Sequence, residues 1–144
     1  MKKIENSIII NASADKVWSI LMDFDNNPAW NPFMYAISGE QTVGKQLTVT
    51  FKKKGGKGMT FKPIILALKP NHEFRWTGKL GIKGIFDGEH YFLLEQVNNK
   101  KTNLIHGENF SGILTVFLSN MLEKTKIEFQ KMNVALKGYC ERVI

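Results

Sequence analysis

The sequence predicts an α+β domain in which a curved antiparallel sheet of about seven strands wraps around one long C-terminal helix. Two observations support this prediction. Between about residues 33 and 112, short β-rich segments recur between Gly, Pro and Asn turns. Residues 113–141 instead repeat apolar side chains at a period near 3.6, which is typical of an amphipathic helix. The short connections favour antiparallel pairing, because parallel neighbours need long crossovers.

The N-terminal part is predicted to add one strand and two short helices. A β-rich run covers residues 4–11. Ser13 has the character of a helix N-cap. In the helix that follows, Val17 and Leu21 fall on one apolar face, since they are four residues apart. A second short helix or turn is expected at residues 23–30.

Six further strands and the long helix complete the predicted order. The strands are expected at residues 33–40, 46–53, 58–69, 73–80, 85–96 and 102–112. The helix presents an apolar stripe that includes Leu122, Phe129, Met132 and Leu136. At 1.5 Å of rise per residue, roughly 25 residues make a rod of about 40 Å, long enough to cross a small sheet.

Length and composition predict a single soluble domain over residues 1–144. Cys140 is the one cysteine, so no intrachain disulfide can form, which favours a reducing cytoplasm. The apolar run at residues 8–10 is shorter than a signal-peptide core. No stretch approaches the roughly 20 apolar residues of a membrane span. We therefore expect a cytoplasmic location.

The chain is basic, with 20 Lys and Arg against 13 Asp and Glu and a formal net charge of +7. Lysines cluster at residues 52–54 and 100–101. They lack the interleaved aromatic residues that stack on single-stranded nucleic acid. We interpret the charge mainly as a solubility feature, with nucleic acid a disfavoured partner. Interaction with protein or nucleic acid through this basic surface remains an alternative.

The predicted architecture raises the question of what fills the concave side of the sheet. One helix cannot fill a sheet of this size, so either large side chains fill it or a cavity remains. A dry cavity of roughly 300 Å³ would cost about 7 kcal/mol at about 24 cal/mol per Å³. That cost is comparable with a total stability of about 5–15 kcal/mol. A cavity would therefore need polar lining groups or an occupant.

Polar groups are predicted on that concave face. Strand alternation places His90 on one strand, and His106 and Glu108 on the next, toward the same side. If these strands form a hairpin, the tightest register that keeps both inward faces together pairs Leu94 with Leu104, Phe92 with His106, and His90 with Glu108. The sequence thus predicts a His–Glu pair and a second His on the concave wall.

Aromatic and methionine residues are predicted to line the same space. Small-molecule sites are usually apolar with a few polar groups. The competing interpretation is that each apolar member is ordinary core. The candidate ligand-binding residues are Trp30, Phe33, Phe74, Trp76, His90, Phe92, His106, Glu108, Phe110, Phe117, Met121, Phe129 and Met132.

His90 and Glu108 are also the candidate catalytic residues. Acid–base chemistry on a bound molecule needs a proton shuttle beside an apolar pocket, and a His–carboxylate pair can serve as one. The alternative is a satisfied buried pair that only anchors a ligand. No spacing typical of a metal or cofactor site occurs, so neither is expected. Convergence of His106 with the pair would nevertheless make a three-ligand metal site conceivable.

Four segments resemble the bacterial polyketide cyclase/dehydrase-like branch of the START-like, helix-grip (SRPBCC) superfamily. They are Ile8-Ile9-Ile10-Asn11-Ala12-Ser13-Ala14-Asp15-Lys16-Val17-Trp18, Trp30-Asn31-Pro32-Phe33, Gly84-Ile85-Phe86-Asp87-Gly88-Glu89-His90-Tyr91-Phe92, and His106-Gly107-Glu108-Asn109-Phe110-Ser111-Gly112-Ile113-Leu114. The resemblance implies a helix-grip fold with a cavity between sheet and long helix. Its members include lipid carriers, hormone receptors and aromatase/cyclases without one shared catalytic motif, so it implies no catalytic residue.

Two functions stay open beside interaction through the basic surface. The first is intracellular binding of a small, mostly apolar or aromatic ligand that is lipid- or polyketide-like. The second is a cyclase/dehydratase-type reaction in which His90 and Glu108 exchange protons with the substrate.

Overall fold

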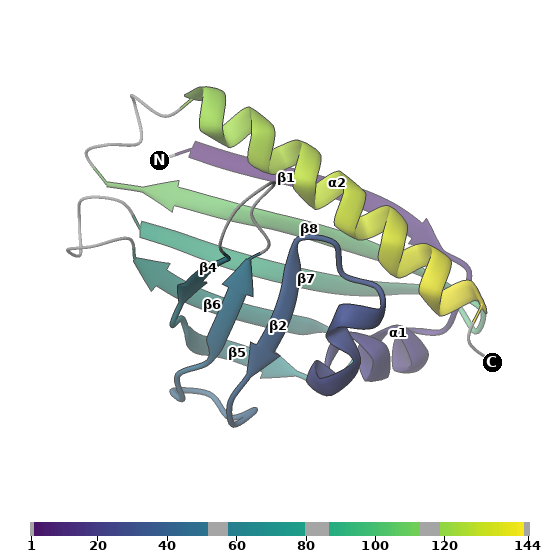
Figure 1. The fold of residues 1–144 in the computed structure, drawn as a ribbon. Helices are drawn as coiled ribbons and strands as arrows, with labels where there is room; N and C mark the ends of the chain where they lie inside the picture. Colours follow the sequence, from purple (N-terminus) through teal and green to yellow (C-terminus); the bar gives the residue numbers. More distant parts are fainter. Residues whose placement is uncertain (1, 52–57, 80–86, 113–118, 143–144) are drawn as a thin grey trace.

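The computed structural model describes residues 2–51, 58–79, 87–112 and 119–142. Their arrangement is shown in Figure 1. In chain order the elements are β1 (Lys2–Ile10), α1 (Ala14–Leu21), the 3₁₀ helix η1 (Phe24–Ala29), β2 (Met34–Ser38), β3 (Thr48–Phe51), β4 (Met59–Phe61), β5 (Ile64–Lys69), β6 (Glu73–Lys79), β7 (Asp87–Asn98), β8 (Lys101–Ser111) and α2 (Ser119–Arg142). The predicted α+β class and the order of its helices and strands are confirmed.

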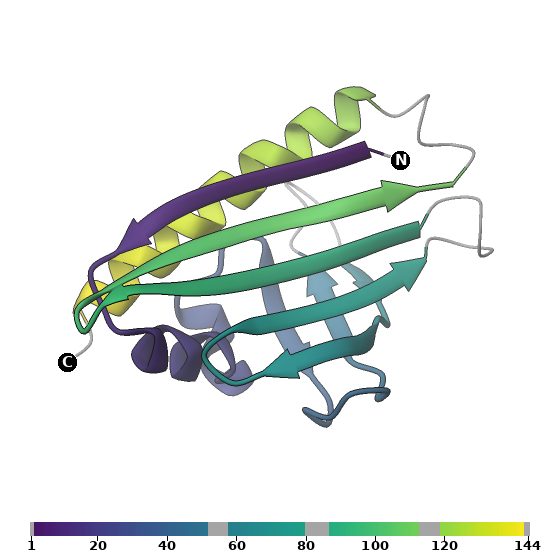
Figure 2. The ribbon, with the colours of Figure 1, turned by 180° about the vertical axis from the view of Figure 1, so that it is seen from behind.

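The strands form two antiparallel sheets. A large sheet has the order β1-β8-β7-β6-β5, and a small sheet has the order β2-β3-β4. The helix α2 runs along β1 and β8, and α1 and the small sheet lie on the same face of the large sheet (Figure 1). Seen from behind, the strands of the large sheet lie in front of α2 (Figure 2). The inner face of the large sheet is therefore its face toward α2 and the small sheet.

The predicted strand at 58–69 is in fact two strands that belong to different sheets. Pro63 separates β4 from β5. Proline has no N–H group and interrupts a strand ladder. The Pro63 carbonyl instead accepts a hydrogen bond of 2.8 Å from the Leu47 N–H, which helps to join the two sheets. The described residues thus form eight strands in two sheets, where about seven in one sheet were predicted.

The register of the β7–β8 hairpin agrees with the prediction. Leu94 pairs with Leu104, Phe92 with His106, and His90 with Glu108. The register shift in this pair lies between Gln96 and Asn98, near the turn. The inward alternation is consequently unbroken where the polar residues lie.

The helices also begin and pack largely as predicted. Ser13 caps α1, because its hydroxyl accepts a hydrogen bond of 3.2 Å from the Lys16 N–H. The predicted stripe of α2 is buried at Leu122, Phe129, Met132 and Leu136. The predicted start of this helix at residues 113–118 lies outside the described residues. No helix in the described part of the chain has both the length and the apolar character that a membrane span needs.

Candidate functional site

A chain of four polar side chains crosses the interior from the large sheet to α2. Glu108 Oε1 lies 2.9 Å from His90 Nδ1. His90 Nε2 lies 2.8 Å from His106 Nε2, and His106 Nδ1 lies 2.8 Å from Asn133 Oδ1. We call these four residues the polar chain. His90, His106 and Asn133 are at most 3% exposed, whereas the Glu108 side chain is 18% exposed. The polar chain therefore reaches solvent at its Glu108 end.

Strand pairing and helix periodicity bring these four side chains together. His90 and Glu108 are direct partners across β7 and β8, and His106 lies two residues before Glu108 on the same face. Asn133 follows Phe129 by four residues, so both lie on the inward face of α2. The pairing of β7 with β8 and the periodicity of α2 therefore account for the positions of all four side chains.

Aromatic rings enclose both histidines. The His90 ring stacks on Trp76, with 4.8 Å between ring centroids. The His106 ring lies between Phe92 and Phe129, stacked on each at 4.4 and 4.3 Å. These rings exclude water from the histidines. A charged histidine would therefore lose its hydration, and only hydrogen bonds within the polar chain could replace it.

Burial shifts the protonation of the polar chain toward neutral forms. Burial raises the pKa of Glu108 to about 8 and lowers the pKa of His90 to about 3. The pKa of His106 is held well below 6.5, first by burial and then by its neighbour His90. At neutral pH the structure therefore favours a protonated Glu108 carboxyl beside two neutral imidazoles.

The predicted convergence of His90, His106 and Glu108 occurs, but the contacts form a line and do not surround a common point. Both nitrogens of each ring face a polar atom of the polar chain. Within the described ranges, no group of three or more His, Cys, Asp or Glu side chains has a geometry that could hold a metal ion. The arrangement suits proton transfer along hydrogen bonds.

Most predicted ligand-binding residues are buried against one another. Phe74, Trp76, Phe92 and Phe129 are at most 3% exposed and, with the two histidines, form a continuous set of ring contacts. These four rings form a packed layer, which we call the floor. Such packing is what the ordinary-core interpretation expects for each of them.

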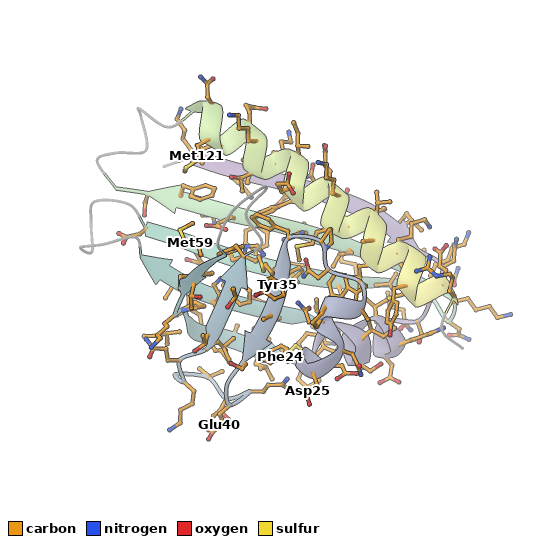
Figure 3. The ribbon with its side chains drawn as sticks, in the orientation of Figure 1. Phe24, Asp25, Tyr35, Glu40, Met59 and Met121 are labelled. Carbon is orange, nitrogen blue, oxygen red and sulfur yellow. The ribbon has the colours of Figure 1, made fainter. Side chains whose placement is uncertain are left out.

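The remaining predicted residues occupy different environments. Trp30 and Met132 are buried in the main core. Phe110 is buried in a second cluster with Ile4, Leu122 and Phe129. Phe33 is only half-buried and packs against both clusters. Met121 is 39% exposed near the start of α2, and Phe117 lies outside the described residues (Figure 3).

Sequence reasoning missed three residues of the site. The half-buried rings of Phe51 and Phe61 stack at 4.9 Å, and Phe51 also contacts Phe33 at 4.8 Å. We call Phe33, Phe51 and Phe61 the phenylalanine row. Alternation could have predicted Phe51, because Leu47 and Val49 precede it on the same face of the segment.

Asn133 is the third missed residue. It is a polar side chain inside the apolar stripe of α2, between Phe129 and Leu136. A polar residue at such a position needs a buried partner. The sequence therefore held a signal for Asn133, but not the identity of the partner.

A shallow hollow also lies on α2, lined by Ile127, Gln130, Lys131, Val134 and Ala135. Its walls come from one helix, and Ile127 and Val134 are at least half exposed. Such a surface cannot enclose a ligand. We therefore place the candidate site at the phenylalanine row and the Glu108 end of the polar chain.

Fold and site together define a helix-grip domain: a curved antiparallel sheet holds a long C-terminal helix across an aromatic interior. Residues 1–141 match the family described as polyketide cyclase / dehydrase and lipid transport, and the chain belongs to this family. No curated protein matches the chain in sequence.

Solved structures agree with this fold. The chain is similar to the Zhui aromatase/cyclase from Streptomyces sp. R1128, with a TM-score of 0.77, 17% identity, and coverage of 98% of this chain and 94% of that one. It is also similar to a START superfamily protein from Mycobacterium smegmatis, with a TM-score of 0.74, 19% identity and coverage of 99% of both chains. A norcoclaurine synthase mutant from Thalictrum flavum gives a TM-score of 0.71 at 16% identity, covering 96% of this chain and 93% of that one. Identities this low establish the fold alone.

Proposed function

We propose that this protein binds a small, mostly apolar or aromatic ligand inside the cell, between the small sheet and the large sheet. The observation that carries the proposal is the position of the phenylalanine row. Its half-buried rings connect the small sheet to the floor through the contact of Phe61 with Trp76, at 6.3 Å. Glu108, on the same inner face of the large sheet, supplies a partly exposed polar point. An apolar wall with one polar point is the usual composition of a small-molecule site.

Exposed apolar side chains around this region support the same proposal. Met121 on α2 is 39% exposed and Met59 on β4 is 54% exposed. Both lie on the side of the large sheet that α2 and the small sheet cover (Figure 3). Methionine adapts its shape to different apolar partners, which suits a lipid- or polyketide-like ligand. The family description, which includes lipid transport, is consistent with such a ligand.

Native mass spectrometry of the freshly purified protein tests the proposal directly. A stoichiometric bound molecule, identified after extraction, would give the chemical class of the ligand. If the protein carries none, thermal shifts with fatty acids, flavonoids and polyketide-like aromatics provide the test. The absence of any bound molecule and any shift would overturn the binding proposal.

A pair of matched variants locates the ligand. We expect Phe51→Ala to weaken binding about tenfold or more, because it removes the middle ring of the phenylalanine row. Tyr35→Ala removes a 40% exposed ring from the same small sheet and should leave affinity unchanged. Equal effects of the two variants would place the ligand elsewhere.

A second candidate function is acid–base catalysis of a cyclase/dehydratase type. The favouring observation is the direct contact of 2.9 Å between Glu108 and His90, continued to a second histidine. A carboxyl with a pKa of about 8 can exchange a proton near neutral pH. Retained ligand affinity with lost turnover in His90→Ala would support this function. Retained turnover would remove it.

Interaction through the basic surface is the remaining alternative. Binding to nucleic acid through lysines should weaken steeply with salt. Titration with a nucleic-acid duplex at low and high salt measures this, and no binding at low salt would eliminate the alternative.

A further inference from the structure

The hydrogen bonds of the polar chain have a fixed direction. The Asn133 Oδ1 atom can only accept, so His106 must carry its proton on Nδ1. A neutral His106 then offers a lone pair at Nε2, and His90 must donate from its own Nε2. The His90 Nδ1 atom is left as an acceptor, so Glu108 must donate from Oε1. The Asn133 amide thus determines where the proton of Glu108 lies, three hydrogen bonds away.

Reversing this direction would change the position of the Glu108 proton. If the Asn133 amide turned its NH₂ group toward His106, every donor in the polar chain would become an acceptor. Glu108 Oε1 would then accept from His90, so the Glu108 proton would either lie on Oε2 or be absent, and its absence would leave a buried carboxylate with no cation beside it. Burial disfavours that state, which is consistent with the raised pKa of Glu108.

We propose that the polar chain is a proton relay, that Asn133 positions its protons, and that the Glu108 Oε2 atom accepts a phenolic or enolic hydroxyl of the ligand. The proposal rests on the proposed function, since it names the ligand group that the same site receives. Asn133 is a positioning residue in this account, because it acts through His106 and His90.

The Oε2 atom of Glu108 has the geometry for this role. Oε1 is occupied by His90, whereas no described residue is in hydrogen-bond contact with Oε2. Oε2 lies over Gly88, where an added Cβ would be only 2.2 Å away. Because Oε1 carries the proton, Oε2 is an acceptor and recognises a donor group such as a hydroxyl.

Proton transfer through this relay balances without any other reactant. The ligand hydroxyl gives its proton to Oε2 while the proton on Oε1 moves to His90 Nδ1. The carboxyl group remains neutral, the ligand oxygen becomes an anion, and His90 becomes a cation. Passage of the Nε2 proton of His90 to His106 then places the positive charge beside the Asn133 Oδ1 atom.

Most charged groups on the neighbouring elements lie away from the relay. Its ring neighbours Trp76, Phe92 and Phe129 carry no charge. By strand alternation, Lys3, Glu5, Glu73, Arg75 and Glu89 lie on the other face of the large sheet, whereas Lys2 shares the inner face with Ile4 and has Phe110 as its strand partner. On α2, Lys131 pairs with Glu128 and Lys137 with Glu141 at the surface.

Imidazole ¹⁵N NMR of the intact protein tests the positions of the protons without any ligand. For the wild type at pH 7 we expect two neutral rings, His106 with its proton on Nδ1 and His90 with its proton on Nε2. The opposite tautomers, or a charged His90 in the free protein, would overturn the proposal. Because this measurement uses the wild type, it does not depend on the folding of a variant.

Asn133→Asp tests the positioning role. A carboxylate beside His106 Nδ1 should stabilise the imidazolium and move both ¹⁵N shifts of His106 to protonated values at pH 7. Gln130→Glu adds the same charge on an exposed position of α2 and should change neither ring. An unchanged His106 in folded Asn133→Asp would overturn the role of Asn133.

Two probes that share a naphthalene ring test the hydroxyl site by calorimetry. We expect 2-naphthol to bind about tenfold more tightly than 2-methoxynaphthalene, which lacks the donor. Glu108→Leu should abolish this preference. Equal binding of both probes to the wild type would overturn the hydroxyl site and leave the proposed function standing. Binding of neither probe would overturn the hydroxyl site, and fatty acids would then decide the proposed function.

Discussion

The two faces of the large sheet carry polar side chains on neighbouring residues, but these side chains are charged on the outer face and neutral on the inner face. On the outer face, Arg75 contacts both Glu73 and Glu89 at 2.7 Å, and all three are partly exposed. On the inner face, aromatic rings enclose His90, which is bonded to Glu108. The outer face is held by ion pairs in contact with water, whereas the inner face is held by a network whose two histidines are shielded from water and whose Glu108 end reaches it.

The difference is clearest for two glutamates on the paired strands β1 and β8. The pKa of Glu5 is lowered, chiefly by the hydrogen bond that Tyr91 donates and also by Lys3. Burial raises the pKa of Glu108 to about 8. The same residue type is thus an anion on one face and an acid on the other, because the environment decides its charge.

Each face also relies on a glycine beneath its central polar side chain. Tyr91 lies over Gly107, where an added Cβ would be 2.6 Å from the Tyr91 hydroxyl and 2.7 Å from the backbone oxygen of Ile4. Glu108 lies over Gly88, where an added Cβ would meet the Oε2 atom of Glu108. At Gly107 the added Cβ would meet a backbone oxygen of the sheet, which cannot move away. At Gly88 it would meet the end of a side chain, which can.

Breaking the inner network should have the largest effect. His106→Ala leaves a cavity and removes the partner of both His90 and Asn133, so we expect a loss of about 3–5 kcal/mol in the free energy of unfolding. Urea denaturation measures it. His72→Ala, at an exposed histidine, is the matched control and should change little. A loss for His106→Ala below 1 kcal/mol would mean that the network contributes no more than a surface contact.

The two glycines should respond differently. Gly107→Ala should cost about 2–3 kcal/mol, because the Ile4 carbonyl cannot move away without breaking the sheet. Gly88→Ala should cost about 1 kcal/mol, because only the Glu108 carboxyl has to shift and its bond to His90 is lost. Urea denaturation gives both values, and the NMR spectrum of His90 should change only in Gly88→Ala. A larger cost at Gly88 would contradict this explanation.

Stability should depend on pH through Glu108. The pKa of Glu108 is about 8 in the folded protein and 4.5 ordinarily. Its contribution to the free energy of unfolding is therefore complete below pH 4.5 and is lost as the pH rises toward 8. His90, with a pKa lowered from 6.5 to about 3, acts oppositely and loses its contribution as the pH falls below 6.5. Between pH 6.5 and 8, the Glu108 contribution should fall by at most about 1.4 kcal/mol per pH unit.

Glu108→Gln isolates this contribution, because a neutral amide can still donate to His90. Urea unfolding at several pH values from 6.5 to 8 should give a shallower slope for the variant than for the wild type. Parallel slopes would show that Glu108 is already ionised across this range.

The outer face should give the smallest effect. Arg75→Ala removes two ion pairs and a contact of 4.7 Å with the Tyr91 ring. Partly exposed pairs contribute little, so we expect a loss of about 1 kcal/mol or less that shrinks at high salt. Denaturation at low and high NaCl measures it. A salt-independent loss as large as that of His106→Ala would erase the distinction between the two faces.

Periodicity in the sequence was sufficient for much of this structure. Alternation predicted the pairing of His90 with Glu108, because a one-residue slip would turn every inward side chain outward. The stripe of α2 and the cap at Ser13 also followed from local rules. The split at Pro63 was missed, although proline is a local signal, because β-rich residues continue on both sides.

The sequence by itself therefore determined the α+β class, the β7–β8 register and the polar residues that face inward, since these depend on spacing along the chain. Only the tertiary structure decided that Asn133 completes the polar chain and that the small sheet brings Phe61, stacked on Phe51, against Trp76. The tertiary structure also decided that Glu108 is an acid with a pKa of about 8. The physical reason is that burial and hydrogen-bond direction depend on which distant residues meet.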